Sequence, residues 1–351
     1  MPVFSLHYLR RVGAEVFSAS GAEPAAADVV AGLLADANAV GHDSHGVIRI
    51  PQYISTIEKG EIDPKAAVVV ERETNVSAVL DGQWGFGQVV MNHAVEWGIE
   101  RAGRYGVAAV TIRNANHIGR LGSYMQQVAE QGMIGLLCTN SHGGGSIVAP
   151  WGGMAGRLGT NPLAAGFPGP AGGALVLDMT TSVVAEGKVR IKRNRGESVP
   201  AGWIVDAAGM PSTDPDDFYG EPRGSLLPFG GSMGHKGYGL GVVVELLGGA
   251  LSGAGCARGA SVRNGNGNFL LVVDIARFQP LDEYRAQIKA YIAYLKATRK
   301  AEGFTDILMP GEIEERERER RRDGIFVEEE TWTQILACGD RVGAMMPEPE
   351  A

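Results

Sequence analysis

Cysteine is scarce in this sequence, whose 351 residues include three, at Cys138, Cys256 and Cys338. The odd count and wide spacing exclude a disulfide framework, which pairs an even number of cysteines. No Cys-x-x-Cys pair occurs that would indicate a structural zinc site. So few cysteines are typical of a protein of the reducing cytoplasm, and we expect that compartment.

Long hydrophobic runs are also missing. No stretch of about 18 consecutive apolar residues occurs, so we expect no membrane-spanning helix. The first nine residues lack a basic start followed by an apolar run, and His7, Arg10 and Arg11 interrupt the segment early. We therefore expect no signal peptide.

Positive charge does not dominate, and familiar nucleotide fingerprints are absent. The net charge is −8, which repels polyphosphate backbones, so we expect no nucleic-acid partner. The chain contains no Gly-x-Gly-x-x-Gly, no Walker A sequence and no His-Glu-x-x-His, which excludes a conventional Rossmann phosphate loop. With 44% apolar and 21% charged residues, the chain has the composition of a globular protein long enough for two or three domains.

Hydrophobic periodicity predicts an α/β fold. Helical and strand-like segments alternate, and several strand pairs look like hairpins, so we expect a mixed sheet. The predicted helices cover 3–19, 24–40, 88–105, 123–131, 238–251, 281–302 and 312–323, and the predicted strands cover 67–70, 76–80, 107–112, 134–139, 174–179 and 269–274. In the last helix, Glu312 and Arg316, Glu314 and Arg318, and Glu317 and Arg321 are four apart and predict ion pairs on a solvated face.

Glycine, by contrast, is abundant. The 51 glycines often stand beside His, Asn, Thr or Lys, where a backbone can approach a ligand closely. The first such cluster is Gly41–Tyr53, which follows a predicted helix end. Its His45 could exchange a proton near neutral pH, its Arg49 could clamp a carboxylate, and its Tyr53 could add a hydroxyl. The plainer alternatives are a solvated cap at His42 and a surface ion pair at Arg49.

Four further polar, glycine-rich clusters lie at strand ends or at a helix start. They cover 114–122, 139–145, 178–182 and 234–239. Ligands usually sit at the carboxyl ends of strands in α/β folds, and the second of these clusters could form a nest of N–H groups for an anion. Lys236 at a helix N-terminus is a natural phosphate site. Ordinary turns and caps remain the alternative for each.

Taken together, these clusters resemble the malate/L-lactate dehydrogenase family, which includes ureidoglycolate, sulfolactate and diketogulonate dehydrogenases, and resemble its hydroxycarboxylate dehydrogenase branch most. The resemblance covers nearly the whole chain, with eight modest motifs in the same order. They are Gly-His-Asp-Ser-His-Gly-Val at 41–47, Asn-x-x-His-x-Gly at 114–119, Val-Ala-Pro-Trp-Gly-Gly at 148–153, Gly-Thr-Asn-Pro at 159–162, Leu-Asp-Met-Thr-Thr-Ser at 177–182, Arg-Asn-Arg-Gly-Glu at 193–197, Gly-His-Lys-Gly at 234–237 and Pro-Gly-Glu at 310–312.

The resemblance implies an α/β, non-Rossmann fold with a mixed, largely antiparallel sheet, and a homodimer. It implies a helical domain of residues 1–74 with 281–351, a mixed-sheet core of 75–115 with 235–280, and a cofactor-binding domain of 116–234. The implied reaction moves a hydride between NAD or NADP, with NAD slightly favoured, and the C2 carbon of a small 2-hydroxy or 2-oxo acid.

The resemblance also implies roles for particular residues, with no metal site among them. His45 and His117 would lie at the reacting centre, and we favour His45 as proton donor in reduction while keeping both. The implied substrate contacts are Ser44, Arg49 and Tyr53. The implied cofactor contacts are Ser141, Asp178, Met179, Thr180, Thr181, Lys236, Gly237, Gly311, Glu312 and Ile313.

Three other functions stay open at this point. The first is a reductase of cyclic 2-imino acids, as in one relative. The second is a metal-dependent lyase that would use His42, Asp43, His45 and His117 as ligands. The third is a non-catalytic binding protein.

Overall fold

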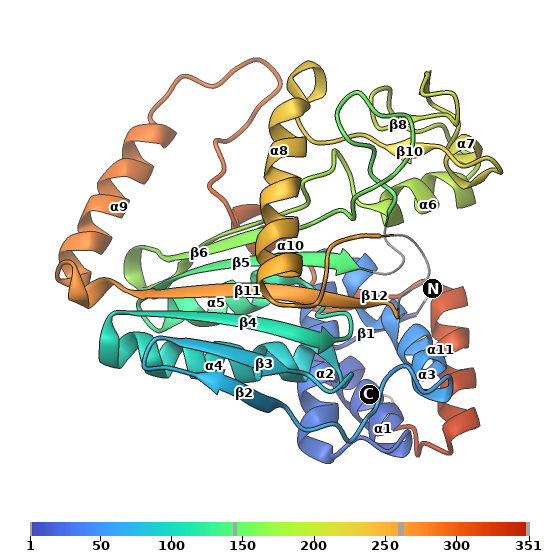
Figure 1. The fold of residues 1–351 in the computed structure, drawn as a ribbon, viewed down its shortest axis with the longest axis horizontal. Coiled ribbons are helices and arrows are strands. Elements are labelled where there is room, and N and C mark those ends of the chain that lie inside the picture. The colour runs from blue at the N-terminus through green and yellow to red at the C-terminus, as the bar shows by residue number, and fades with distance from the viewer. Residues whose placement is uncertain (1, 143–145, 259–262, 349–351) are drawn as a thin grey trace.

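A seven-stranded sheet forms the centre of the molecule in the computed structural model, which describes residues 2–142, 146–258 and 263–348 (Figure 1). The strand order is β2-β3-β4-β11-β5-β6-β7. In chain order, the strands are β2 (Val69–Glu73), β3 (Ser77–Asp81), β4 (Val107–Ala115), β5 (Met133–His142), β6 (Leu163–Pro168), β7 (Ala174–Met179) and β11 (Gly265–Asp274).

The pairing confirms a mixed, largely antiparallel sheet. Neighbouring strands are antiparallel except β3 and β4, which are parallel and are joined by the helix α4 (Gly87–Tyr105). A parallel pair needs such a crossover, whereas antiparallel neighbours can follow one another through short turns. The sequence patterns did not predict β6, whose Ala-Ala-Gly centre lacks the branched residues typical of strands.

The registers bring several strand ends to one edge of the sheet. Ala115 at the end of β4 pairs with Asn266 near the start of β11, and Asn266 pairs with Ser141 near the end of β5. Leu163, which begins β6, pairs with Met179, which ends β7. Polar clusters that are far apart in the sequence therefore meet at the same edge.

Helices cover this sheet and build a second core beside it. The helices α4 and α5 (Leu121–Glu130) pack on the sheet, and their apolar side chains share one buried cluster with β4 and β11. A second cluster forms around Phe17, where α1 (Leu6–Ala19), α2 (Pro24–Ala39), α3 (Ile50–Glu58) and α11 (Glu329–Val342) meet. The pair β1 (Val3–Phe4) and β12 (Ile325–Phe326) joins the two chain ends here (Figure 1).

A third, smaller hydrophobic cluster is formed by buried side chains from the segment 148–226. Its short strands β8 (Ile204–Val205), β9 (Pro211–Ser212) and β10 (Ser225–Leu226) form a separate sheet, flanked by α6 (Glu186–Asn194) and α7 (Pro215–Tyr219). The large sheet contains strands from all three predicted domains: β2 from the predicted helical domain, β3, β4 and β11 from the predicted core, and β5, β6 and β7 from the predicted cofactor domain.

Several predicted boundaries were wrong at the helix ends. The predicted helix 238–251 begins earlier and divides into α8 (His235–Val244) and a π-helical segment, Glu245–Leu251. The last two predicted helices are shorter in the structure, as α9 (Leu281–Lys296) and α10 (Glu312–Arg320). Among the residues that the structure describes, no helix is both long and apolar enough to cross a membrane.

Candidate active site

The segment after α2 carries His45 and Arg49 on two short 3-10 turns, η1 (Asp43–His45) and η2 (Val47–Arg49). His45 and Arg49 do not share one helical turn, because Gly46 is extended between the two. The Asn38 side chain explains the break: its Oδ1 accepts from Val47 N at 2.7 Å, and a Cβ on Gly46 would lie 2.0 Å from that oxygen. Only glycine allows this approach.

His117 lies in the loop that follows β4. The Asn116 side chain anchors this loop, since its Nδ2 donates to Trp84 O at 2.8 Å and to Gly85 O at 3.2 Å. The start of α4 presses against the same loop, because a Cβ on Gly87 would lie 2.1 Å from Asn116 O. The backbone around His117 is thus held from the end of the sheet and from the start of a helix.

The two predicted catalytic histidines face each other. Their ring centroids are 5.5 Å apart with an interplanar angle of 24°. The Ser44 hydroxyl lies 3.0 Å from His45 Nδ1, and the Tyr53 hydroxyl lies 2.7 Å from His117 Nδ1. The Nε2 atoms of both rings have no hydrogen-bond partner among the described residues. Each ring is held at one nitrogen and keeps the other for a ligand.

Burial and nearby cations disfavour the protonated form of both rings. Burial, Arg49, His42 and Arg120 together lower the pKa of His45 to about 3. Burial, Arg49 and His45 hold the pKa of His117 well below its usual value of about 6.5. Both rings are neutral at neutral pH in this structure, and a neutral imidazole is a base that can accept a hydroxyl proton.

Arg49 supplies a cation beside this pair with donors to spare. Its Nε donates to Ser44 O at 2.6 Å and its Nη1 donates to Gln52 Oε1 at 2.6 Å. It forms no ion pair with any carboxylate that the structure describes, so the surface ion pair considered from sequence is wrong. The remaining N–H groups at the end of the guanidinium are free for an anion.

Most of the predicted cofactor contacts gather at the polar sheet edge. Ser141 and Met179 lie at the ends of β5 and β7. Thr181 N donates to Thr160 O at 2.9 Å, and Thr181 O accepts from Phe229 N at 2.9 Å, which brings the start of α8 to this edge. Gly143, Gly144 and Gly145, which were predicted to complete an anion nest, lie outside the described residues.

Two predicted contacts open α8. Gly237 is packed so closely that an added Cβ would lie 2.0 Å from Phe229 O. Lys236 is exposed, and its ammonium has no ion pair or hydrogen bond among the described residues. Thr180 and Asp178 have internal partners: the Thr180 hydroxyl donates to Ser182 O at 3.0 Å, and the half-buried Asp178 carboxylate accepts from Gly122 N at 2.7 Å.

The predicted contacts at the start of α10 lie beside β7. Val176 N donates to Pro310 O at 3.2 Å, so the segment that leads into Gly311 contacts the edge strand β7. Val176 lies two residues before Asp178 in that strand. Ile313 is exposed, whereas the Glu312 carboxylate already accepts from Lys296 Nζ at 2.5 Å. A cavity of about 350 Å³ adjoins this contact, with a lining that includes Val40, Arg120, Val176, Gly311 and Glu314.

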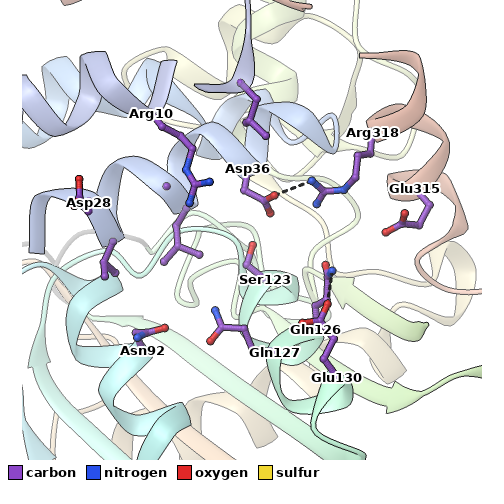
Figure 2. Close-up of a pocket in the computed structure, with 14 residues that line it drawn as sticks. Arg10, Asp28, Asp36, Asn92, Ser123, Gln126, Gln127, Glu130, Glu315 and Arg318 are labelled. Carbon is purple, nitrogen blue, oxygen red and sulfur yellow. Dashed lines mark hydrogen bonds and ion pairs between the residues drawn. The ribbon is translucent and has the colours of Figure 1, made fainter. Parts of the chain in front are cut away.

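A larger cavity of about 700 Å³ adjoins the first, since Gln126, Glu130 and Glu315 line both. Asp36 and Arg318 both line this cavity, and Figure 2 shows them pointing toward each other. They form an ion pair of 2.9 Å. The predicted catalytic and substrate-contacting residues do not line this cavity. The proposed reacting centre and this cavity are therefore separate places.

The sequence did not predict two residues that support this centre, Gln88 and Asn266. Gln88 Nε2 donates to the Tyr53 hydroxyl at 2.8 Å, which directs the phenolic hydrogen toward His117. Asn266 Oδ1 accepts from Ile118 N at 3.2 Å and so holds the residue after His117. Neither lies in a motif with a recognisable spacing, and their roles depend on contacts between distant segments.

The ligand set considered for a metal-dependent lyase does not assemble. His42 Nε2 lies 3.2 Å from Glu314 Oε1, and the Asp43 carboxylate accepts from Asn38 and Arg321. Within the described ranges, no group of three or more His, Cys, Asp or Glu side chains is arranged to hold a metal ion.

Comparison with known proteins places this chain in a family. A family model described as malate/L-lactate dehydrogenase matches residues 4–336. The chain is 35% identical to an L-lactate dehydrogenase of Cupriavidus necator, over 98% of this chain and 99% of that protein. It is 36% identical to hydroxycarboxylate dehydrogenase B of Escherichia coli, over 95% of this chain and 92% of that protein.

Solved structures agree. A sulfolactate dehydrogenase from Methanocaldococcus jannaschii superposes with a TM-score of 0.89 at 33% identity and covers 98% of each chain. A delta1-piperideine-2-carboxylate reductase from Pseudomonas syringae superposes with a TM-score of 0.82 at 30% identity, over 96% of this chain and all of that one. The chain belongs to the malate/L-lactate dehydrogenase family, which confirms the resemblance seen in its motifs.

Proposed function

We propose that this protein transfers a hydride between a nicotinamide cofactor and the C2 carbon of a small 2-hydroxy or 2-oxo acid, at the site formed by His45, His117 and Arg49. The family and the named relatives make the chain an oxidoreductase of the 2-hydroxy acid dehydrogenase class. The observation that carries the residue assignment is the facing imidazole pair, 5.5 Å apart, beside a guanidinium that has no carboxylate partner among the described residues.

The chemistry of the site fits a substrate with a carboxylate next to the reacting carbon. The spare N–H groups of Arg49 can hold that carboxylate with two parallel hydrogen bonds. Burial is the main cause that lowers the pKa of both histidines, and Arg49 adds to it. The bound negative charge would offset the contribution of Arg49. Substrate binding would thereby make an imidazole a better proton carrier at the moment when a proton must move to or from the 2-oxygen.

The two histidines would divide the proton work. We keep His45 as the proton donor in reduction, with Ser44 orienting its ring through Nδ1. His117, held at Nδ1 by the Tyr53 hydroxyl, would bind the same 2-oxygen with Nε2. Because the Tyr53 hydroxyl is buried between Gln88 and His117, we propose that it positions His117, and its direct contact with substrate stays a prediction.

The residues at the sheet edge fit a pyridine dinucleotide. Lys236, in the first turn of α8, offers an ammonium that has no partner in the part of the chain that the structure describes. The segment before α8 is joined to Thr181 through Phe229, and backbone groups can approach closely at Gly237. We propose these residues, with Asp178 to Thr180 and Gly311 to Ile313, as the cofactor contacts. The bound cofactor would accept or donate the hydride, and the protein would fix its distance from C2.

Charge favours NAD over NADP. The cavity beside Gly311 has Glu130, Glu314 and Glu315 in its lining against the single cation of Arg120. A 2′-phosphate would bring further negative charge to this wall, where like charges repel. We therefore propose NAD, in agreement with the preference stated from sequence.

We propose a homodimer in which the second copy covers α8 and α9. Within the single chain, α9 has no buried residue, although Tyr291 and Tyr294 are 56% and 75% exposed. On the α8 side, Leu246 and Leu251 are 54% and 58% exposed. Exposed apolar side chains grouped in this way are typical of a subunit interface. The three-part division of the chain stays a prediction, because the main buried cluster combines residues of the ranges 75–115, 235–280 and 116–234.

A second candidate is the reduction of cyclic 2-imino acids. The superposition with the piperideine-carboxylate reductase favours it, since that protein shares the fold over 96% of this chain. A cyclic imine also presents a carboxylate next to the carbon that receives hydride, so Arg49 would serve it equally.

A substrate panel tests the proposal. Small 2-oxo acids, 2-hydroxy acids and cyclic 2-imino acids are assayed with each of the two cofactors at about 340 nm, the absorbance of reduced nicotinamide. We expect the highest kcat/KM for a 2-oxo acid with NADH. A higher kcat/KM for the imines would select the second candidate, and the absence of turnover with any of these acids would overturn both.

A further inference from the structure

A buried carboxylate, Glu245, begins the π-helical segment that continues α8. Its Oε1 accepts from Asn140 Nδ2 at 3.0 Å and from Ala257 N at 2.6 Å, and its Oε2 accepts from Asn161 Nδ2 at 2.6 Å. The residue is only 5% exposed. Burying a carboxylate is costly unless N–H groups satisfy it, and here donors from three separate segments converge on it.

One arm of this network leads to the catalytic loop. Asn140 Oδ1 accepts from Gly267 N at 2.9 Å, and Asn140 O accepts from Asn266 Nδ2 at 2.9 Å. Asn266 Oδ1 then accepts from Ile118 N at 3.2 Å. This N–H belongs to the peptide that joins His117 to Ile118. A chain of buried hydrogen bonds therefore runs from the carboxylate to the backbone of the histidine.

The other arm leads to the loop after β7. Asn161 is fully buried, and its Nδ2 donates to Gly241 O at 3.0 Å as well as to Glu245. The residue before it, Thr160, accepts from Thr181 N at 2.9 Å and from Thr181 Oγ1 at 3.1 Å. Thr181 is one of the proposed cofactor contacts. The same carboxylate is thus joined, through intervening residues, to both the His117 loop and the Thr181 loop.

The segment that carries Glu245 has a second, exposed face. Val243 and Leu246, its neighbours in the chain, are 49% and 54% exposed on the surface proposed to meet the second subunit. Gly248 in the same segment fits against the sheet, since an added Cβ would lie 2.9 Å from Asn140 N. The segment therefore spans from the proposed interface to the polar edge of the sheet.

We infer that Glu245 is a positioning residue that fixes the distance between the His117 loop and the Thr181 loop, and hence between the substrate and the cofactor. The inference rests on the proposed function, because it takes His117 and Thr181 as contacts of the two ligands. Hydride transfer needs the two carbons in close, aligned contact, so a small shift between the loops lowers the rate. Buried hydrogen-bonded partners behind functional groups typically affect activity by about 10- to 100-fold.

Three variants separate the two arms. Asn266→Ala removes the bond to Ile118 N, and Asn161→Ala removes the bond toward the Thr181 loop. Glu245→Gln disturbs both, because an amide has one accepting oxygen and its NH2 group would face another donor. Because Glu245→Gln keeps the volume of the side chain, it still tests the inference if Asn266→Ala or Asn161→Ala does not fold. Ser252→Ala is the matched control, since Ser252 is buried in the following turn and donates to Gly248 O at 2.5 Å outside both arms.

We expect Asn266→Ala to lower kcat by about 10- to 100-fold and to shift the pH profile of kcat/KM, with cofactor Kd unchanged. Asn161→Ala should raise the Kd for reduced cofactor, measured by its fluorescence, without moving the pH profile. Glu245→Gln should show both effects, and Ser252→Ala neither. If all folded variants differ from the wild type only in Tm, the residues are merely structural and the inference is wrong. The fluorescence titration needs no turnover, so a wild type that binds cofactor but reduces no acid counts against the proposed function instead.

Discussion

At the scale of single residues, the two histidines proposed as catalytic should also affect the stability of the fold. The folded-state pKa of His45 is lowered to about 3 and that of His117 is also lowered, whereas an unfolded histidine titrates near 6.5. Between these values the unfolded chain binds protons that the folded chain does not, so folding stability falls as the pH falls from about 6.5 toward 3. Each ring contributes at most about 1.4 kcal/mol per pH unit in this window.

The pH dependence of unfolding checks this. Urea unfolding of the wild type and of His45→Gln at several pH values from 7.5 to 4.5 should give a free energy of unfolding that falls less steeply in the variant. His93→Gln, a change on α4 away from the centre, serves as the control. Equal slopes for the wild type and His45→Gln would show that His45 protonates as readily in the folded protein as in the unfolded chain.

Arg49 carries the second residue-scale prediction. Arg49→Lys keeps the charge but loses the planar fork that can hold a carboxylate with two hydrogen bonds. We expect kcat/KM for 2-oxo acids to fall roughly 10- to 100-fold, the value of a charge-assisted bond of about 1.5–3 kcal/mol. The corresponding 2-oxo esters, which lack the carboxylate, should be affected far less.

The comparison between acid and ester is decisive here. If Arg49→Lys changes both substrates alike and by only a few-fold, Arg49 does not hold the carboxylate. The cation would then have to be sought at Arg120, which lies close enough to influence the pKa of His45. Steady-state kinetics on the two substrates, with circular dichroism to confirm folding, make this measurement.

At the scale of elements, the start of α4 sets the position of the His117 loop. A Cβ at Gly87 would lie 2.1 Å from Asn116 O and 2.6 Å from the His117 carbonyl carbon, both backbone atoms that cannot turn aside. Gly87→Ala should therefore lower the Tm and also reduce kcat, because the loop must move. Gly103→Ala in the same helix meets only Met133 Cε at 3.5 Å, so it should leave kcat unchanged. Equal effects of the two changes on kcat would contradict this account.

Regular elements were predictable where periodicity is local. The patterns predicted α1, α2, α4 and β7 to within three residues of their observed ends. The π-helical segment from Glu245 was not predictable, because the apolar pattern of a π-turn resembles that of an α-helix. The folded position of His117 depends on Asn116, Gly87 and Asn266, and no spacing in the sequence reveals that these meet.

The ion pairs of α10 show the same limit. Helical spacing predicted three pairs within the helix, and only Glu317 with Arg321 forms, at 3.2 Å. Arg318 instead binds Asp36 at 2.9 Å, and Glu314 lies 3.2 Å from His42. Spacing of four residues makes an ion pair possible but does not exclude a better-placed partner on another helix. The charged face attaches α10 to α2 and to the segment of the active site rather than facing solvent alone.

At the scale of the whole molecule, the proposed dimer can be tested at the α8 surface. Leu246→Glu places a charge on a residue that is 54% exposed in the single chain and would be covered by a second subunit. Burying an unpaired charge in an interface is costly, so the variant should be monomeric by light scattering while the wild type is dimeric. Met210→Glu, at a residue that is 62% exposed and directly precedes β9, is the control and should remain dimeric. A monomeric wild type with full turnover would contradict the proposed dimer.

The central claim is that His45 and His117 together form the reacting centre of a 2-hydroxy acid dehydrogenase. The most direct measurement is kcat for 2-oxo acid reduction, followed by the loss of reduced cofactor, in the wild type, His45→Gln and His117→Gln. Removing an acid-base group typically costs about 10²- to 10⁴-fold. We predict a loss in this range for both variants, with unchanged circular dichroism and unchanged cofactor Kd. Two folded variants that each keep nearly the wild-type kcat would contradict the account.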